Sequence, residues 1–103
     1  MININYEFRK GIFFIRLIGE INKRNNKQIT KELTELISKN AFKYIVINTN
    51  YIDKIDLDGL NSIIEICYIT DNIANLVVCD KSNIIRRLIK SNIQNINDEI
   101  EVL

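Results

Sequence analysis

The chain has 103 residues, enough for a single hydrophobic core, and we expect one domain over residues 1–103. Its apolar fraction of 47% and charged fraction of 26% are typical of a soluble globular protein, and a net charge of +1 does not favour nucleic acid as a partner. No apolar run approaches the roughly 20 residues of a membrane span, and the N-terminus lacks the apolar core of a signal peptide. These properties predict a cytoplasmic protein that does not insert into a membrane.

Histidine and cysteine usage narrows the possible chemistry. The chain contains no histidine, which removes Ser/His and Cys/His catalysis as well as histidine metal sites. Cys67 and Cys79 both lie within apolar segments. We therefore expect reduced thiols in the core and no disulfide.

The first twenty residues predict a β-hairpin. Residues 2–9 alternate apolar and polar side chains, which is typical of a strand near a sheet edge with one buried face. Lys10-Gly11 supplies a turn, since glycine tolerates positive φ. Residues 12–18 are more continuously apolar and predict a central strand antiparallel to the first. Gly19-Glu20-Ile21-Asn22 then ends the strand, and a basic loop follows over residues 23–27.

A helix and a strand–loop–helix unit are expected next. Apolar residues at helical spacing predict an amphipathic helix that ends near Asn40, with Ile29, Leu33, Leu36 and Ile37 on its buried face. Residues 44–48 predict a buried strand of a parallel sheet, followed by a polar loop over residues 49–57. A second helix should open at Asp58 with that residue as its N-cap. Its apolar face would comprise Leu60, Ile63, Ile64 and Cys67.

The remaining segment predicts a further strand and a further helix. Residues 76–79 form a short apolar run, and Ser82 stands where it would cap a helix whose apolar face includes Ile85, Leu88 and Ile89. Alternation over residues 96–103 is compatible with an extra edge strand. The order β-β-α-β-α-β-α-(β) predicts an α/β fold. Its mixed sheet would have an antiparallel N-terminal hairpin and a parallel core, packed by three to four helices.

An acidic cluster after the central strand invites comparison with a calcium loop. Asp56, Asp58, Gly59 and Glu65 match four positions of an EF-hand loop. Lys54 would stand at the first ligand position, where a carboxylate belongs, and the preceding segment is expected to be a strand instead of a helix. We therefore expect no metal ion here.

The same acids do not predict an enzyme. A general acid–base pair among Asp53, Asp56 and Asp58 is not expected, because no nucleophile, histidine or glycine-rich phosphate loop accompanies them. Solvated loop acids with one helix cap explain them better. We expect no catalytic residue and no cofactor.

Asp56-Leu57-Asp58-Gly59-Leu60 resembles the Asp-Ser-Ser-Gly-Leu motif of the STAS family, the sulfate transporter and anti-sigma factor antagonist domains. The N-terminal hairpin, the Gly19–Asn22 turn, the element order and the length are also similar to a stand-alone anti-sigma factor antagonist. The resemblance implies a STAS-like fold and a bacterial, non-enzymatic module in transcription regulation. Such a module binds an anti-sigma factor with serine-kinase activity.

In that family the residue directly before the motif glycine is the serine or threonine that the kinase phosphorylates, and phosphorylation releases the partner. Here that position is Asp58, and the neighbouring hydroxyl position is Leu57. An aspartate carries a permanent negative charge but cannot accept phosphate from a serine kinase. Ser62 and Thr49 do not match the motif.

Three interpretations of Asp58 follow from this departure. The protein is a constitutive binder, or a locked phospho-like form with a different partner, or a diverged domain in which Asp58 is only a helix cap. In the first two, the partner surface would combine the 49–57 loop, the helix start and the 22–27 loop, with the following contact residues: Asn22, Lys23, Asp53, Asp56, Asp58 and Asn61. An alternative within the same family is the soluble STAS subunit of a membrane lipid-transport complex.

Overall fold

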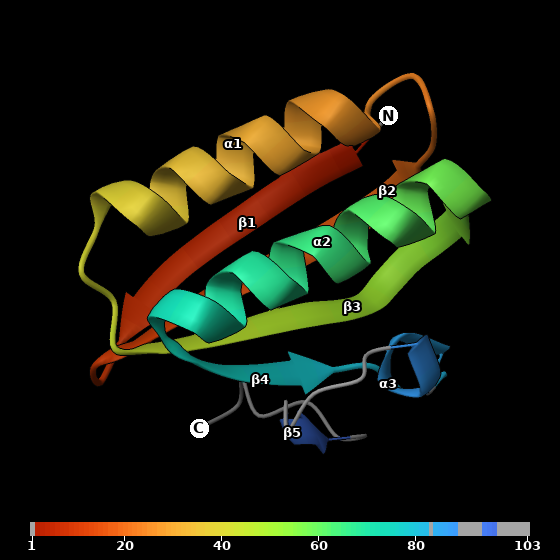
Figure 1. Ribbon diagram of the computed structural model, residues 1–103. Helices are drawn as coiled ribbons and strands as arrows, with labels where there is room; N and C mark the ends of the chain where they lie inside the picture. Colours follow the sequence, from red (N-terminus) through yellow and green to blue (C-terminus); the bar gives the residue numbers. More distant parts are fainter. Residues whose placement is uncertain (1, 83, 89–93, 97–103) are drawn as a thin grey trace.

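A five-stranded mixed sheet forms one layer of the molecule, and two long helices form the other (Figure 1). The computed structural model describes residues 2–82, 84–88 and 94–96. The elements in chain order are β1 (Ile2–Arg9), β2 (Ile12–Ile21), α1 (Asn26–Lys39), β3 (Tyr44–Ile55), α2 (Leu57–Ile73), β4 (Asn75–Cys79), α3 (Ile84–Leu88) and β5 (Gln94–Ile96). The strands lie in sequence order across the sheet, with β1 antiparallel to β2 and every other pair parallel. This confirms the expected element order and mixed sheet.

The β1–β2 hairpin turns at Lys10 and Gly11, whose φ angles are 51° and 80°. Positive φ at both central residues is the signature of a tight two-residue hairpin turn that matches the natural twist of the strands. The register runs from the pair Arg9–Ile12 to the pair Ile2–Gly19 without a shift. The hairpin predicted from the sequence is therefore confirmed.

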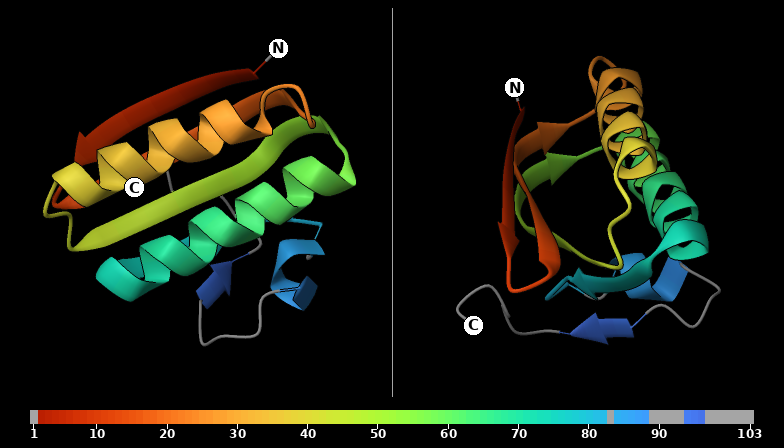
Figure 2. Two further views of the ribbon diagram at one scale, coloured as in Figure 1. Left: turned by 45° about the horizontal axis from the view of Figure 1, so that its top comes forward. Right: turned by 90° about the vertical axis from the view of Figure 1, so that its left-hand side faces the viewer.

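The main core lies between the sheet and the two long helices, which cover the same face of the sheet (Figure 2). Each helix buries one apolar stripe against the sheet, and the fully or nearly fully buried side chains include Ile15, Leu17, Ile29, Leu33, Ile37, Ile45, Ile47, Ile63, Ile66 and Cys67. Cys67 and Cys79 are buried free thiols, as expected. Burial of these side chains provides the main driving force for folding.

The third strand is longer than its sequence suggests. A polar loop was expected over residues 49–57, whereas β3 continues to Ile55. The reason is the neighbouring strand, because β2 also extends and pairs with this segment up to Ile21–Ile55. The pairing with β4 stops at Asn48–Cys79, so the end of β3 has a strand on one side only and tolerates exposed polar residues.

The helical layer is smaller than predicted. Three to four helices were expected to pack the sheet. Among the described residues only α1 and α2 are long helices, and α3 has five residues. Ser82 contributes to the start of α3, as its Oγ accepts from the Ile84 N–H at 3.3 Å, but Ile89 lies outside the described residues. A short strand is found at 94–96, and the rest of the expected edge strand, 97–103, also lies outside them. No helix in the described segments has the length and apolar character needed to cross a membrane.

Candidate partner-binding face at the start of α2

The N-cap of α2 is Asp56. This residue has extended backbone angles (φ −94°, ψ −179°), and its Oδ1 accepts from the Gly59 N–H at 2.8 Å. The expectation that Asp58 caps the helix is therefore wrong, because the helix begins at Leu57 and Asp58 lies in its first turn. A cap carboxylate satisfies an N–H three residues later, and only Asp56 stands at that separation from Gly59.

Asp56 also holds two other segments in place. Its Oδ2 accepts from the Lys23 N–H at 3.0 Å, and its own N–H donates to the Ile21 carbonyl at 3.2 Å. One residue thus joins the end of β2, the following loop and the start of α2. Its carboxylate is occupied by these backbone contacts.

The loop after β2 is ordered by its own side chains. The Asn22 Nδ2 donates to Glu20 Oε2 at 2.8 Å, and Asn22 Oδ1 accepts from the Arg24 N–H at 2.8 Å. The Asn25 Oδ1 accepts from the Asn22 N–H at 2.9 Å. Asn22, predicted to contact a partner, therefore uses its amide within the loop, whereas the neighbouring Lys23 is exposed.

Gly59 is required by a close approach of α2 to β2. A Cβ atom added at this position would lie 2.5 Å from the Ile21 carbonyl oxygen and 2.8 Å from Ile21 Cγ2. A side chain at position 59 would push the helix start away from the end of β2. The glycine of the motif thus sets the position of the helix start and of Asp58 beside it.

Asp58 is exposed in the first turn of α2, and its carboxylate makes no hydrogen bond or ion pair within the described part of the chain. A negative charge is favourable there because the free N–H groups and the helix dipole give this end a partial positive charge. Leu57 is 71% exposed, and Asp53 and Asn61 are also exposed. These predicted site residues thus flank one junction and are accessible, whereas Asp56 serves the fold.

The hydroxyl groups near the motif are not accessible. Ser62 is buried, and its Oγ accepts from Asn26 Nδ2 at 3.0 Å. Thr49 is also buried and donates to the Cys79 carbonyl at 3.2 Å. Neither residue presents its hydroxyl to another protein.

An apolar pocket of about 290 Å³ adjoins the start of α2, a feature that the sequence did not reveal. Its apolar lining comes from three separate segments: Ile52 and Ile55 of β3, Leu60 of α2, and Ile84 and Ile85 of α3. No window of sequence shows that they converge. Ile55 and Ile84 at this pocket are partly exposed, which only the structure shows.

The outer side of α2 is acidic. The helix carries three acids, Asp58, Glu65 and Asp71, all exposed, and neither lysine nor arginine. We call the surface formed by Leu57, Asp58, Asn61 and the apolar pocket the α2 face. An apolar patch beside exposed carboxylates resembles a protein interface, which has an apolar centre and a polar rim.

Comparison with known families matches the STAS domain over residues 3–101. Solved structures with the same fold include the anti-sigma factor antagonist SpoIIAA in its unphosphorylated form, with a TM-score of 0.71, 16% identity, and coverage of 94% of this chain and 90% of that one. A putative anti-sigma factor antagonist from Thermotoga maritima matches with a TM-score of 0.72 and 15% identity, and the match covers 94% of this chain and 87% of that one. Bacillus SpoIIAA in the phosphorylated form matches with a TM-score of 0.62 and 18% identity, and the match covers 84% of this chain and 79% of that one.

Proposed function

The chain belongs to the STAS domain family, and on this basis we propose that it is a non-enzymatic regulatory module of anti-sigma factor antagonist type that binds its partner through the α2 face. The observation that carries the proposal is the exposed Asp58, whose carboxylate has no partner among the described residues, on a helix start held in place by Asp56 and Gly59. The partner would be a cytoplasmic anti-sigma factor or a related serine kinase.

The α2 face suggests the chemistry of that partner. The acids of α2 have no cation on the same helix to neutralise them, so a basic partner surface would be attracted. The apolar pocket would accept an aliphatic or aromatic side chain, since anchors of this kind supply most of the binding energy at interfaces. A partner segment with an apolar residue next to an arginine or lysine fits both features.

Asp58 sets how binding would be regulated. Its fixed negative charge cannot be added or removed by a serine kinase and phosphatase. Binding would therefore be constitutive, or selective for a partner that accepts the phospho-like state. In either case the amount of the protein, and not its modification, would control the partner.

The experiment is affinity capture from the native cell with immobilised wild-type protein, Asp58→Asn and a matched control, Asp71→Asn. Asp71 is another exposed acid of α2, near the opposite end of the helix. We expect wild type and Asp71→Asn to retain an anti-sigma factor or serine kinase, and Asp58→Asn to retain much less. Equal retention by all three would reject the α2 face, and recovery of transporter ATPase and permease subunits would favour the lipid-transport alternative.

A second experiment separates the two forms of regulation. Asp58→Ser restores a hydroxyl at the motif position, exposed in the first turn of α2. Incubation with the captured kinase and labelled ATP should label this variant and leave the wild type unlabelled. A kinase that binds the variant without labelling it would exclude the phospho-like interpretation.

A further inference from the structure

The outer edge of β1 has no partner strand among the described residues. β1 is the terminal strand of the sheet and pairs on one side only, with β2. It is eight residues long and contains neither proline nor lysine, two residue types that commonly protect edge strands from pairing. Its free backbone groups are therefore available to another strand.

The register shows which backbone groups these are. A turn over Arg9–Ile12 of this kind closes with a hydrogen bond between its first and last residues, so Arg9 and Ile12 form a hydrogen-bonded pair. Hydrogen-bonded and non-hydrogen-bonded pairs alternate along an antiparallel ladder. The residues that direct their N–H and C=O groups to the free edge are thus Ile2, Ile4, Tyr6 and Phe8.

Large aromatic side chains on this strand are poorly covered. Phe8 is 61% exposed and Tyr6 is 41% exposed, although both belong to the face of β1 that turns towards the helices. The Phe8 ring meets the Phe42 ring at a centroid distance of 5.9 Å, and Tyr6 donates to Glu32 Oε2 at 3.2 Å. Burying the exposed part of these rings would stabilise any complex that covers them.

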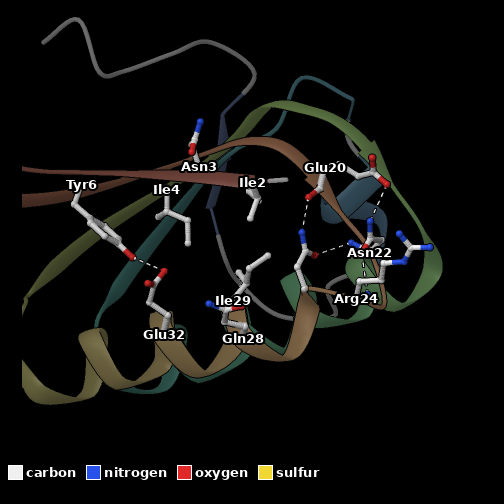
Figure 3. Close-up of a pocket in the computed structure, with 11 residues that line it drawn as sticks. Ile2, Asn3, Ile4, Tyr6, Glu20, Asn22, Arg24, Gln28, Ile29 and Glu32 are labelled. Carbon is white, nitrogen blue, oxygen red and sulfur yellow. Dashed lines mark hydrogen bonds between the residues drawn. The ribbon is translucent and has the colours of Figure 1, made fainter.

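A groove of about 660 Å³ lies between the same strand and α1 (Figure 3). Ile2 and Ile4 of β1 point into it, and Ile29 of α1 lies opposite them. Polar side chains from α1 and the loop after β2 line the rest, among them Gln28 and Glu32. The groove is thus apolar beside β1, where a side chain from an added strand would enter.

We propose that a second copy of this chain adds its β1 antiparallel to this edge, which joins two five-stranded sheets into one of ten strands. In the register centred on Asn5, Ile4 faces Tyr6 of the second copy and Ile2 faces Phe8 of the second copy. The Phe8 ring of each copy then lies beside Ile2 at the mouth of the other's groove.

The alternation of β1 favours a second copy over an unrelated strand. In this antiparallel register, apolar residues of one copy face apolar residues of the other, and the opposite sheet face pairs Asn3 with Glu7 and Asn5 with Asn5. No like charges face each other, and cross-strand pairs of this kind stabilise a sheet. A shift of one residue would place Ile4 and Tyr6 opposite polar side chains, which excludes it. Among the registers that keep apolar residues opposite apolar residues, the one centred on Asn5 is tested by crosslinking.

The first test is the mass in solution, measured by sedimentation equilibrium on the purified full chain. The wild type should increase from 12.1 kDa towards twice that mass as concentration rises. Phe8→Lys should remain a monomer over the same range, because each lysine would bring a charge to the apolar edge. Ile73→Lys changes a residue of similar exposure at the end of α2 and should behave as the wild type does.

A wild type that stays monomeric throughout, or a Phe8→Lys variant that associates as strongly as the wild type, would overturn the proposal. Circular dichroism of both variants establishes that they are folded, which is expected because both positions are largely exposed.

The second test fixes the register by crosslinking. Asn5 faces its own copy in a non-hydrogen-bonded pair, where Cα atoms lie about 4.5 Å apart, within the range for a disulfide. Asn5→Cys should form a disulfide-linked dimer on mild oxidation. Asn3→Cys is the control, since Asn3 faces Glu7, and the native thiols are buried. Crosslinking of Asn5→Cys no faster than Asn3→Cys would refute this register.

Discussion

Replacing Gly59 with alanine tests how the start of α2 is positioned. The added Cβ would lie 2.5 Å from the Ile21 carbonyl oxygen, whereas ordinary van der Waals contact begins near 3.4 Å. Backbone would have to move by about 0.9 Å, the difference between these two distances. The same carbonyl accepts from the Asp56 N–H, so the displacement also disturbs the β3–α2 junction.

The expected loss of stability combines two opposing effects. Forcing a methyl group into a packed site costs about 3 kcal/mol at the upper end of the usual range, which suits a contact with backbone. Alanine favours a helix over glycine by about 1 kcal/mol. The net prediction is a decrease of about 2 kcal/mol in the free energy of unfolding, which corresponds to a fall in Tm of about 8–16 °C.

Urea denaturation and thermal melting followed by circular dichroism measure this loss. Asn61→Ala, at an exposed position two residues further along α2, is the control and should be neutral or slightly stabilising, because it gains helix propensity without a contact. A Gly59→Ala variant as stable as the wild type would show that the approach to Ile21 does not constrain the helix.

Substitutions at three further positions probe the junction and the core. Asp56→Ala should lower the free energy of unfolding by about 1 kcal/mol by removing the helix cap. Asp56→Asn should restore only part of it, because the amide has one acceptor oxygen in place of the two carboxylate oxygens that accept from Gly59 and Lys23; equal urea midpoints for both variants would contradict this. Ser62→Ala should cost about 1–2 kcal/mol in urea denaturation, because it leaves the Asn26 amide without its partner. Burial, with smaller contributions from the charges of Asp80 and Asp71, raises the pKa of Cys67 from 9.0 to about 12. The unfolded thiol ionises first, so stability should fall as pH rises from 9 to 12; Cys67→Val should reduce this fall in pH-dependent melting, and an unchanged fall would refute the assignment.

Much of the fold could be predicted because hydrophobic periodicity reports the buried faces directly. The alternation over residues 2–9 and the helical spacing of Ile29, Leu33 and Ile37 both correspond to observed elements. The extent of β3 could not be predicted, since residues 49–55 are held in the sheet by β2 and not by their own apolar pattern. Tertiary pairing of this kind overrides local propensity.

The strand–helix junction was predicted in position but not in detail. The motif located the strand–helix junction, yet two aspartates two residues apart are equally good caps by sequence, and only the contact between Asp56 and Gly59 distinguishes them. The apolar pocket escaped prediction because β3, α2 and α3 each contribute only part of it. Convergence of distant segments is a property of the fold that no single stretch of sequence carries.

The three hydrogen bonds by which Asp56 joins β2, the following loop and α2 also affect the thermodynamics of partner binding. The backbone around Lys23 and the first turn of α2 is fixed before any partner arrives, so complex formation need not pay for ordering a loop. We would expect little change in hydrogen-exchange protection of this junction when a complex forms. Loss of these hydrogen bonds should weaken the affinity for a partner mainly through entropy, even though both carboxylate oxygens of Asp56 are already engaged with backbone N–H groups.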